Sequence, residues 1–145
     1  GMEVLAQVTR PRRLTLALGV QGRDTGEMLA YMEKAVALGT DAVIAMPPTS
    51  GRTLEDYRAY FSALGRASSL PTIVQTSGGA RDLYPSVELI VELARLFPHM
   101  AYVKEESDPV VARMRGEIAA RPTLKGIFGA SLGSTLLYDM RLGVD

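Results

Sequence analysis

The chain has 145 residues, enough for one domain with a hydrophobic core. Its 16 lysines and arginines balance its 16 aspartates and glutamates, so the sequence offers no basic field for nucleic acid or an anionic membrane surface. It contains no cysteine, no secretory signal pattern and no apolar run long enough to cross a membrane. We therefore expect a cytoplasmic globular protein with neither nucleic-acid nor membrane partners.

Short apolar segments alternate with longer amphipathic segments along the whole chain. The short segments have the length and composition of strands and cover residues 14–20, 41–48, 71–77, 100–107 and 124–130. The amphipathic segments have helical spacing and cover residues 24–39, 53–68, 85–97, a segment that begins at residues 108–109, and 134–143. The chain therefore consists of five strand–helix units, each of roughly 25 to 30 residues.

Several residues mark where the predicted helices begin and end. Asp24 and Glu27 have the spacing of a capping box, and Thr53 is in the position of an N-cap. Gly39 follows its helix where a C-terminal glycine is favoured. The other predicted helix starts are Pro85 as a first-turn proline and Asp108 with Pro109 as N-cap and first-turn proline.

Five strand–helix units in succession predict an α/β fold with a parallel sheet and helical crossovers. The period is that of a (β/α)8 TIM barrel, which needs about 250 residues for eight units. Residues 1–145 can therefore form a single partial TIM-barrel domain, or else a five-stranded doubly wound sheet that closes its own core. In the partial barrel the two end strands would have open apolar edges, which favour pairing with another chain. This predicts a homo-oligomer or a longer protein.

A lysine near the end of the fourth predicted strand raises the question of function. In the segment FPHMAYVKEESDP (97–109), period-two alternation puts Lys104 on the same face as Tyr102 and Glu106. Val103 and Glu105 lie on the opposite face. Lys104 is either a strand-end charge paired with one of the two glutamates or a reactive amine in a pocket, and spacing alone favours neither.

In this order and spacing, the units resemble the dihydrodipicolinate synthase / N-acetylneuraminate lyase family over nearly all of residues 14–145. LALGVQGRDTGEMLAYMEKAVALGTDAVIAMPP resembles the family's third strand, the following helix and the fourth strand. LPTIVQTSGG resembles the fifth strand, YVKEES the sixth, and GIFGASLGSTLLYDMRLGVD the seventh strand with its helix. The chain would then correspond to strands three to seven of the barrel.

The resemblance implies that Lys104 holds the position of the family's Schiff-base lysine and that Gly129 lines the pyruvate pocket. The amine would attack the keto carbon of a 2-oxo acid, and the resulting iminium would serve as an electron sink for making or breaking an adjacent bond. The amine must be neutral to react, and an apolar barrel interior would favour that form. No metal and no organic cofactor is implied. Gly129 can equally be a plain strand-end glycine.

Two departures from the family's pattern affect the substrate prediction. Gln75 stands where the family has a proton-donating tyrosine, and a glutamine is no general acid near neutral pH. Following Pro47, the residues Pro48 and Thr49 stand where the synthases have two tyrosines after a proline. We therefore expect a relative that acts on another 2-oxo acid, with Gln75 and Thr49 as substrate-binding groups. The alternative is a non-catalytic barrel fragment that serves as a binding or assembly domain.

Other sites have weaker signals in the sequence. The glycine-containing segments 77–79 and 129–134 lack the spacing of a phosphate loop. A flavodoxin-like nucleotide-binding domain would be compatible with the length of the chain. It would need a phosphate loop, however, and the sequence has none with the required spacing. His99 is the chain's one histidine, and without cysteine a zinc site is not expected.

Overall fold

A computed structural model describes residues 1–130 and 133–145. It contains five parallel strands that form one sheet in the order β1-β2-β3-β4-β5. The strands are β1 Ala17–Gly19, β2 Ala42–Ala45, β3 Thr72–Gln75, β4 Tyr102–Glu105 and β5 Gly126–Gly129. The helices are α1 Met2–Thr9, α2 Thr25–Ala37, α3 Leu54–Ala67, α4 Val87–Leu96, α5 Val110–Ala119 and α6 Leu136–Leu142, with short 3-10 turns η1 Arg10–Arg12 and η2 Pro98–Met100.

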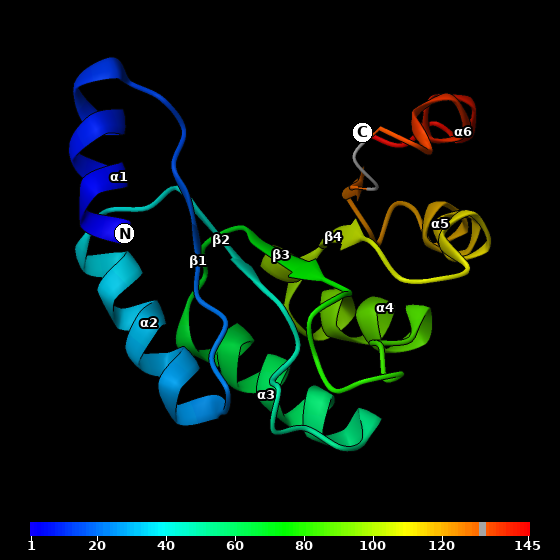
Figure 1. Cartoon of the computed structure of the whole chain (residues 1–145), viewed down its shortest axis with the longest axis horizontal. Helices are drawn as coiled ribbons and strands as arrows, with labels where there is room; N and C mark the ends of the chain where they lie inside the picture. The colour runs from blue at the N-terminus through cyan, green and yellow to red at the C-terminus, as the bar shows by residue number, and fades with distance from the viewer. Residues whose placement is uncertain (131–132) are drawn as a thin grey trace.

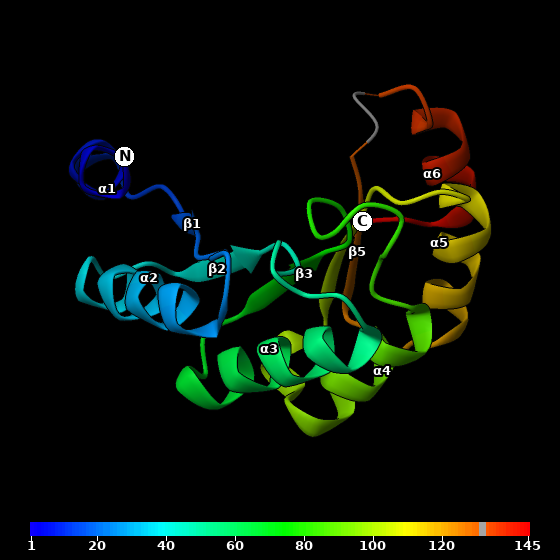
Figure 2. The ribbon, with the colours of Figure 1, turned by 60° about the horizontal axis from the view of Figure 1, so that its bottom comes forward.

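The strand order decides between the two predicted architectures. A doubly wound sheet reverses its strand order and carries helices on both faces. Here the order follows the sequence, and Figure 2 shows α2, α3, α4 and α5 along one outer side of a curved sheet. Figure 1 shows the same succession from the N-terminal α1 to the C-terminal α6. The partial (β/α)8 barrel is therefore confirmed, and the doubly wound alternative is wrong.

The hydrophobic core lies between the sheet and its helices. Each strand turns alternate side chains toward the helices, so Val43, Val74 and Val103 are fully buried in the centre of the sheet. The large buried side chains of the helices pack against them, among them Met28, Tyr57, Phe61, Leu64, Ile90, Leu93 and Met114. On the opposite, concave face, where none of the described helices covers the sheet, the residues of the three central strands are only partly buried: Ala42, Ile44, Ile73, Gln75, Tyr102 and Lys104. Ala17 and Gly19 of the edge strand β1 are exposed.

Side-chain caps explain where helices α2, α3 and α4 begin. The Asp24 side chain accepts a hydrogen bond from the Glu27 N–H at 3.0 Å, and Thr53 forms a full capping box with Asp56. Gly39 has a φ of 66°, a left-handed conformation that favours glycine after a helix. The predictions for Thr53 and Gly39 are confirmed. Asp24 is confirmed as an N-cap, but its predicted capping box with Glu27 is incomplete, because the Glu27 carboxylate accepts a hydrogen bond from the Arg23 N–H at 2.7 Å.

Two predicted helix starts are wrong. Helix α4 begins after Ser86, whose Oγ accepts a hydrogen bond from the Leu89 N–H at 3.2 Å, so Pro85 lies before the helix. Helix α5 begins at Val110 with Pro109 as the N-cap and no side-chain cap, so Asp108 does not cap it. The predicted last helix is shorter and runs over Leu136–Leu142.

Candidate functional site

Lys104 lies near the carboxyl end of β4, on the concave face of the sheet. Its register partners are Gln75 on β3 and Phe128 on β5. Val103 and Glu105 are fully buried on the helix side, whereas Tyr102 and Lys104 are partly exposed. The predicted alternation of β4 is thus confirmed. In barrels of this kind the carboxyl ends of the strands carry the active site.

The Lys104 amine forms an ion pair on this face. Its Nζ lies 2.9 Å from an Oε of Glu106, and a third of the lysine side chain is exposed. The sequence left open whether a charge partner would be Glu105 or Glu106, and the structure selects Glu106. The reactive role of Lys104 stays a prediction, because an ion pair of this kind also occurs at an ordinary strand end.

Glu106 is the centre of a small polar cluster that the sequence alone did not predict as a site. Its second carboxylate oxygen accepts hydrogen bonds from the Gln75 amide and the Ser77 hydroxyl, and its backbone N–H donates to Thr76 Oγ1 at 2.9 Å. Partial burial alone would raise the pKa of Glu106, but the hydrogen bonds from Ser77, Lys104 and Gln75 outweigh it and lower the pKa. Glu106 is therefore a carboxylate at neutral pH.

The structure places Gln75 beside Lys104 but Thr49 elsewhere. Gln75 is paired in register with Lys104, and its amide reaches Glu106 and Ser77. Thr49 is exposed in the loop after β2, where it lines a separate cavity of about 240 Å³ with Met46. The substrate-binding roles of Gln75 and Thr49 stay predictions, and only Gln75 belongs to the Lys104 cluster.

Gly129 turns toward the helices rather than toward Lys104. A Cβ atom built on Gly129 would collide with the carboxylate of Asp139 on α6 and contact Met114 on α5 at 3.3 Å. Its register partner is Glu105, which also faces the helices. The lack of room for a Cβ atom between β5 and the helices explains the glycine at this position. On the concave face, the β5 residue beside Lys104 is Phe128. The predicted contact of Gly129 with pyruvate is a role that only its backbone could fill.

A buried network of charged and polar groups lies on the side of β4 that faces the helices. The Glu105 carboxylate is fully buried and pairs with Arg113 of α5 at 2.9 Å. It also accepts hydrogen bonds from Thr76 Oγ1 at 2.7 Å and from the Ser107 N–H at 2.6 Å. Because Thr76 follows β3 directly, the network holds the ends of β3 and β4 and the start of α5 together. Lys104 and Glu106, which flank Glu105, are thereby held in place.

A second buried carboxylate, Glu117 of α5, lies behind the same strand. Burial, and then the nearby Glu105, raise the pKa of Glu117 to about 9. Glu117 is therefore neutral at pH 7 and does not compete with Glu105 for Arg113.

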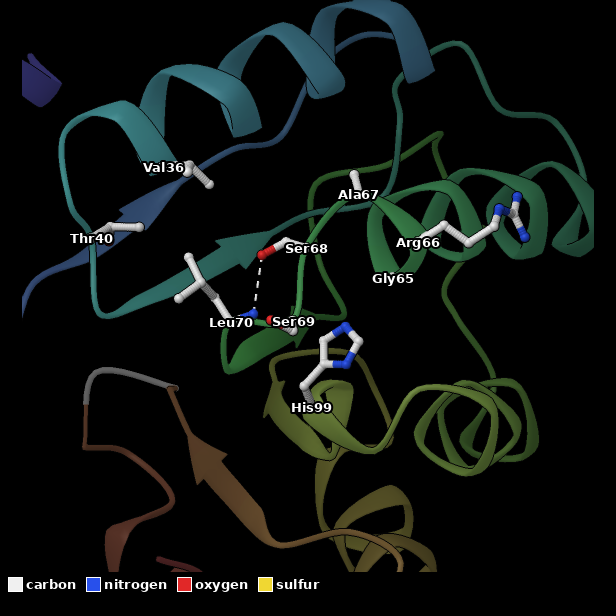
Figure 3. Close-up of a pocket in the computed structure, with 9 residues that line it drawn as sticks. All are labelled: Val36, Thr40, Gly65, Arg66, Ala67, Ser68, Ser69, Leu70 and His99. Atoms are coloured by element: carbon white, nitrogen blue, oxygen red, sulfur yellow. Dashed lines mark hydrogen bonds between the residues drawn. The ribbon is translucent and has the colours of Figure 1, made fainter.

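A sizeable cavity lies at the opposite end of the sheet. It has a volume of about 660 Å³, and Figure 3 shows Thr40, Leu70 and His99 around it. These residues precede β2, β3 and β4, so the cavity is at the amino ends of the strands and away from Lys104. Burial lowers the pKa of His99, and a hydrogen bond with the Gly65 backbone partly opposes this.

Of the glycine-containing segment 129–134, residues 131–132 lie outside the described part of the chain.

The sequence is similar to curated proteins that are all named 4-hydroxy-tetrahydrodipicolinate synthase. No family model matches the chain. The chain is 24% identical over 125 residues to a 4-hydroxy-tetrahydrodipicolinate synthase from Salinibacter ruber, covering 86% of this chain and 41% of that protein. It is 32% identical over 96 residues to the synthase from Sphingopyxis alaskensis, covering 66% of this chain and 33% of that protein. The chain thus spans less than half the length of these relatives.

Solved structures of the same group share the fold. The 4-hydroxy-tetrahydrodipicolinate synthase of Methylacidiphilum fumariolicum SolV superposes with a TM-score of 0.87 at 19% identity, over 99% of this chain and 47% of that chain. The dihydrodipicolinate synthase of Thermotoga maritima superposes with a TM-score of 0.84 at 14% identity, over 99% and 50%. The identity is low, so these structures establish the fold alone. Together with the sequence relatives, they confirm that this chain is similar to the dihydrodipicolinate synthase family over part of its barrel.

Proposed function

We propose that this chain carries the Schiff-base lysine of a dihydrodipicolinate synthase-like lyase. Lys104 is the nucleophile, and pyruvate or another 2-oxo acid is the substrate. The observation that carries the proposal is the Lys104 amine at the carboxyl end of a barrel strand, surrounded by the polar groups of Glu106, Gln75 and Ser77. The similarity to synthases in both sequence and fold supports it.

The chemistry follows from the properties of an iminium. The Lys104 amine adds to the keto carbon, water leaves, and the positively charged C=N group accepts electron density from a neighbouring bond. Aldol cleavage, condensation or dehydration can then take place at the adjacent carbon. Gln75 would orient the substrate through its amide, because a glutamine can donate and accept hydrogen bonds but transfers no proton near neutral pH. This chemistry needs no metal and no organic cofactor.

A non-catalytic barrel fragment is the second candidate. The Lys104–Glu106 ion pair favours it, because a lysine held as an ammonium ion is no nucleophile. The glutamine in place of the family's tyrosine favours it as well. In this case the chain would bind or assemble without forming a covalent adduct.

Reductive trapping separates the two candidates. The chain has three lysines, Lys34, Lys104 and Lys125. On treatment with pyruvate and sodium borohydride, we expect the intact mass to increase by one reduced pyruvyl group in the parent protein. Lys125→Arg, which removes an amine just before β5 at the other end of the sheet, should leave the increase unchanged, whereas Lys104→Arg should abolish it. A parent protein without adduct, or an adduct that persists in Lys104→Arg, would contradict the proposed function.

We further propose that β1–β5 correspond to strands three to seven of the family's barrel and that the protein is a cytoplasmic homo-oligomer. None of the helices in the described part of the chain has the length and apolar composition of a membrane span. Each end strand, β1 and β5, has a neighbour on one side only within the described sheet, and α6 exposes Leu137 and Met140. Unpaired edges and apolar helix faces favour association. Light scattering should give a solution mass well above the 15.6 kDa of one chain, and a strictly monomeric mass would refute the association.

A further inference from the structure

We propose that Glu106 is the general base that removes a proton from C3 of the 2-oxo acid once the acid is bound to Lys104. The proposal rests on the proposed function, because it requires the iminium at Lys104. Gln75 on β3 cannot transfer a proton near neutral pH. The proposal therefore gives the proton transfer at C3 to the carboxylate of Glu106, which follows β4. The cluster at the carboxyl ends of β3 and β4 carries the inference.

The position of Glu106 meets the geometric requirement for this base. One Glu106 oxygen lies 2.9 Å from Lys104 Nζ. In the iminium, C3 is separated from Nζ by the C2 atom alone, so the same oxygen is close to the protons of C3. A general base must be within hydrogen-bonding reach of the proton that it removes, and the Glu106 carboxylate is in direct contact with the Lys104 amine.

The surroundings of Glu106 fix its orientation and its charge. Gln75 and Ser77 both donate to the second oxygen, and the first oxygen is left to Lys104. The same hydrogen bonds lower the pKa of Glu106, so at neutral pH the group is a proton acceptor and not a donor. Gln75 then has a second role as a positioning residue, because its amide aims the base.

The step balances without any oxidant or reductant. The Lys104 lone pair forms the C–N bond at C2, and the C2 oxygen leaves as water after taking up protons from the amine and the solvent. In the iminium, the C3–H bond breaks and its proton goes to the Glu106 oxygen. The bonding pair forms the C2=C3 double bond, while the electrons of the C=N π bond return to nitrogen. The product is an enamine on Lys104 that can attack an electrophile or take the proton back.

Exchange of the pyruvate methyl protons in D2O measures this step separately from Schiff-base formation. The loss of the methyl signal is followed by proton NMR, and the fraction of Lys104 trapped by borohydride is determined in parallel. In Glu106→Gln, we expect the exchange rate per trapped Lys104 to fall by at least about 100-fold, the lower end of what general-base catalysis contributes. Glu106→Asp should recover part of the rate because it restores a carboxylate at a longer distance.

Controls make each outcome decisive. Glu55→Gln removes an exposed carboxylate on α3 and should exchange like the parent protein. Far-UV circular dichroism verifies that each variant is folded. If Glu106→Gln does not fold, Ser77→Ala replaces it as the test variant, because it keeps the Glu106 carboxylate and removes one of its hydrogen-bond donors. In that variant the normalised exchange should fall by several-fold.

The possible failures are distinguishable. If Glu106→Gln keeps its adduct and exchanges as fast as the parent protein, Glu106 is not the base. If the variant loses the adduct altogether, Glu106 acts before the iminium exists, and the C3 role is overturned. If the parent protein forms no adduct at all, the proposed function has failed and the role of Glu106 with it.

Discussion

Replacing Arg113 with alanine is expected to lower the free energy of unfolding by about 3–5 kcal/mol, as is typical when one partner of a buried ion pair is removed. The Glu105 carboxylate would remain fully buried, facing Glu117 instead of a cation. The Pro85 carbonyl, which accepts a hydrogen bond from Arg113 at 2.6 Å, would also lose its donor. Urea denaturation followed by circular dichroism measures the change.

An exposed ion pair provides the matched control for this prediction. Arg23 pairs with Glu27 at 3.2 Å, but 78% of the arginine side chain is exposed. Arg23→Ala should therefore cost at most about 1 kcal/mol. If Arg113→Ala were no more destabilising than Arg23→Ala, the Glu105–Arg113 network would not stabilise the fold. That result would also contradict its role in holding Lys104 and Glu106 in place.

Replacing Glu117 with glutamine is expected to remove a pH dependence of stability. Burial, then Glu105, raise the pKa of Glu117 from 4.5 to about 9 in the folded chain. Between these values the unfolded chain has released the proton and the folded chain still holds it. The unfolded state thus binds fewer protons, and stability falls with rising pH by about 1.4 kcal/mol per unit. Over the range from pH 4.5 to 7, the loss amounts to about 3 kcal/mol.

Glutamine stays neutral at every pH, so Glu117→Gln should gain stability relative to the parent protein as pH rises. The difference between the two free energies of unfolding should increase by about 3 kcal/mol from pH 4.5 to pH 7. Urea denaturation at several pH values gives this difference, and Glu55→Gln on the surface of α3 is the control that should show no such trend. A pH-independent difference for Glu117→Gln would mean that Glu117 is ionised in the folded protein.

The sequence predicted the strands and helices well because their periodicities are local properties. The alternation in β4 assigned Lys104 and Glu105 to opposite faces, and the structure has them there. The strand order could not be derived in the same way, since crossovers of one length serve both a barrel and a doubly wound sheet. Only the order β1 to β5 without reversal excluded the second fold.

The position of Lys104 near the end of β4 was predictable from the sequence, but its neighbours were not. The link from Glu106 to Gln75 joins residues 31 positions apart and depends on the register of β3 and β4. No local pattern contains that register. Gly129 shows the converse limit, since a glycine has no side chain to reveal its face. Its register with Glu105 and the nearby Asp139 show that it faces the helices.

The location of the trapped pyruvyl group decides whether Lys104 is a Schiff-base lysine. A reduced adduct on Lys104 prevents trypsin from cutting after that residue. If Lys104 forms the Schiff base, a joined peptide covering residues 96–113 appears only when pyruvate and borohydride are both present, and cutting after Lys34 and Lys125 is unchanged. Normal cutting after Lys104 in fully treated protein, or an adduct on Lys34 or Lys125, would contradict the Schiff-base role of Lys104.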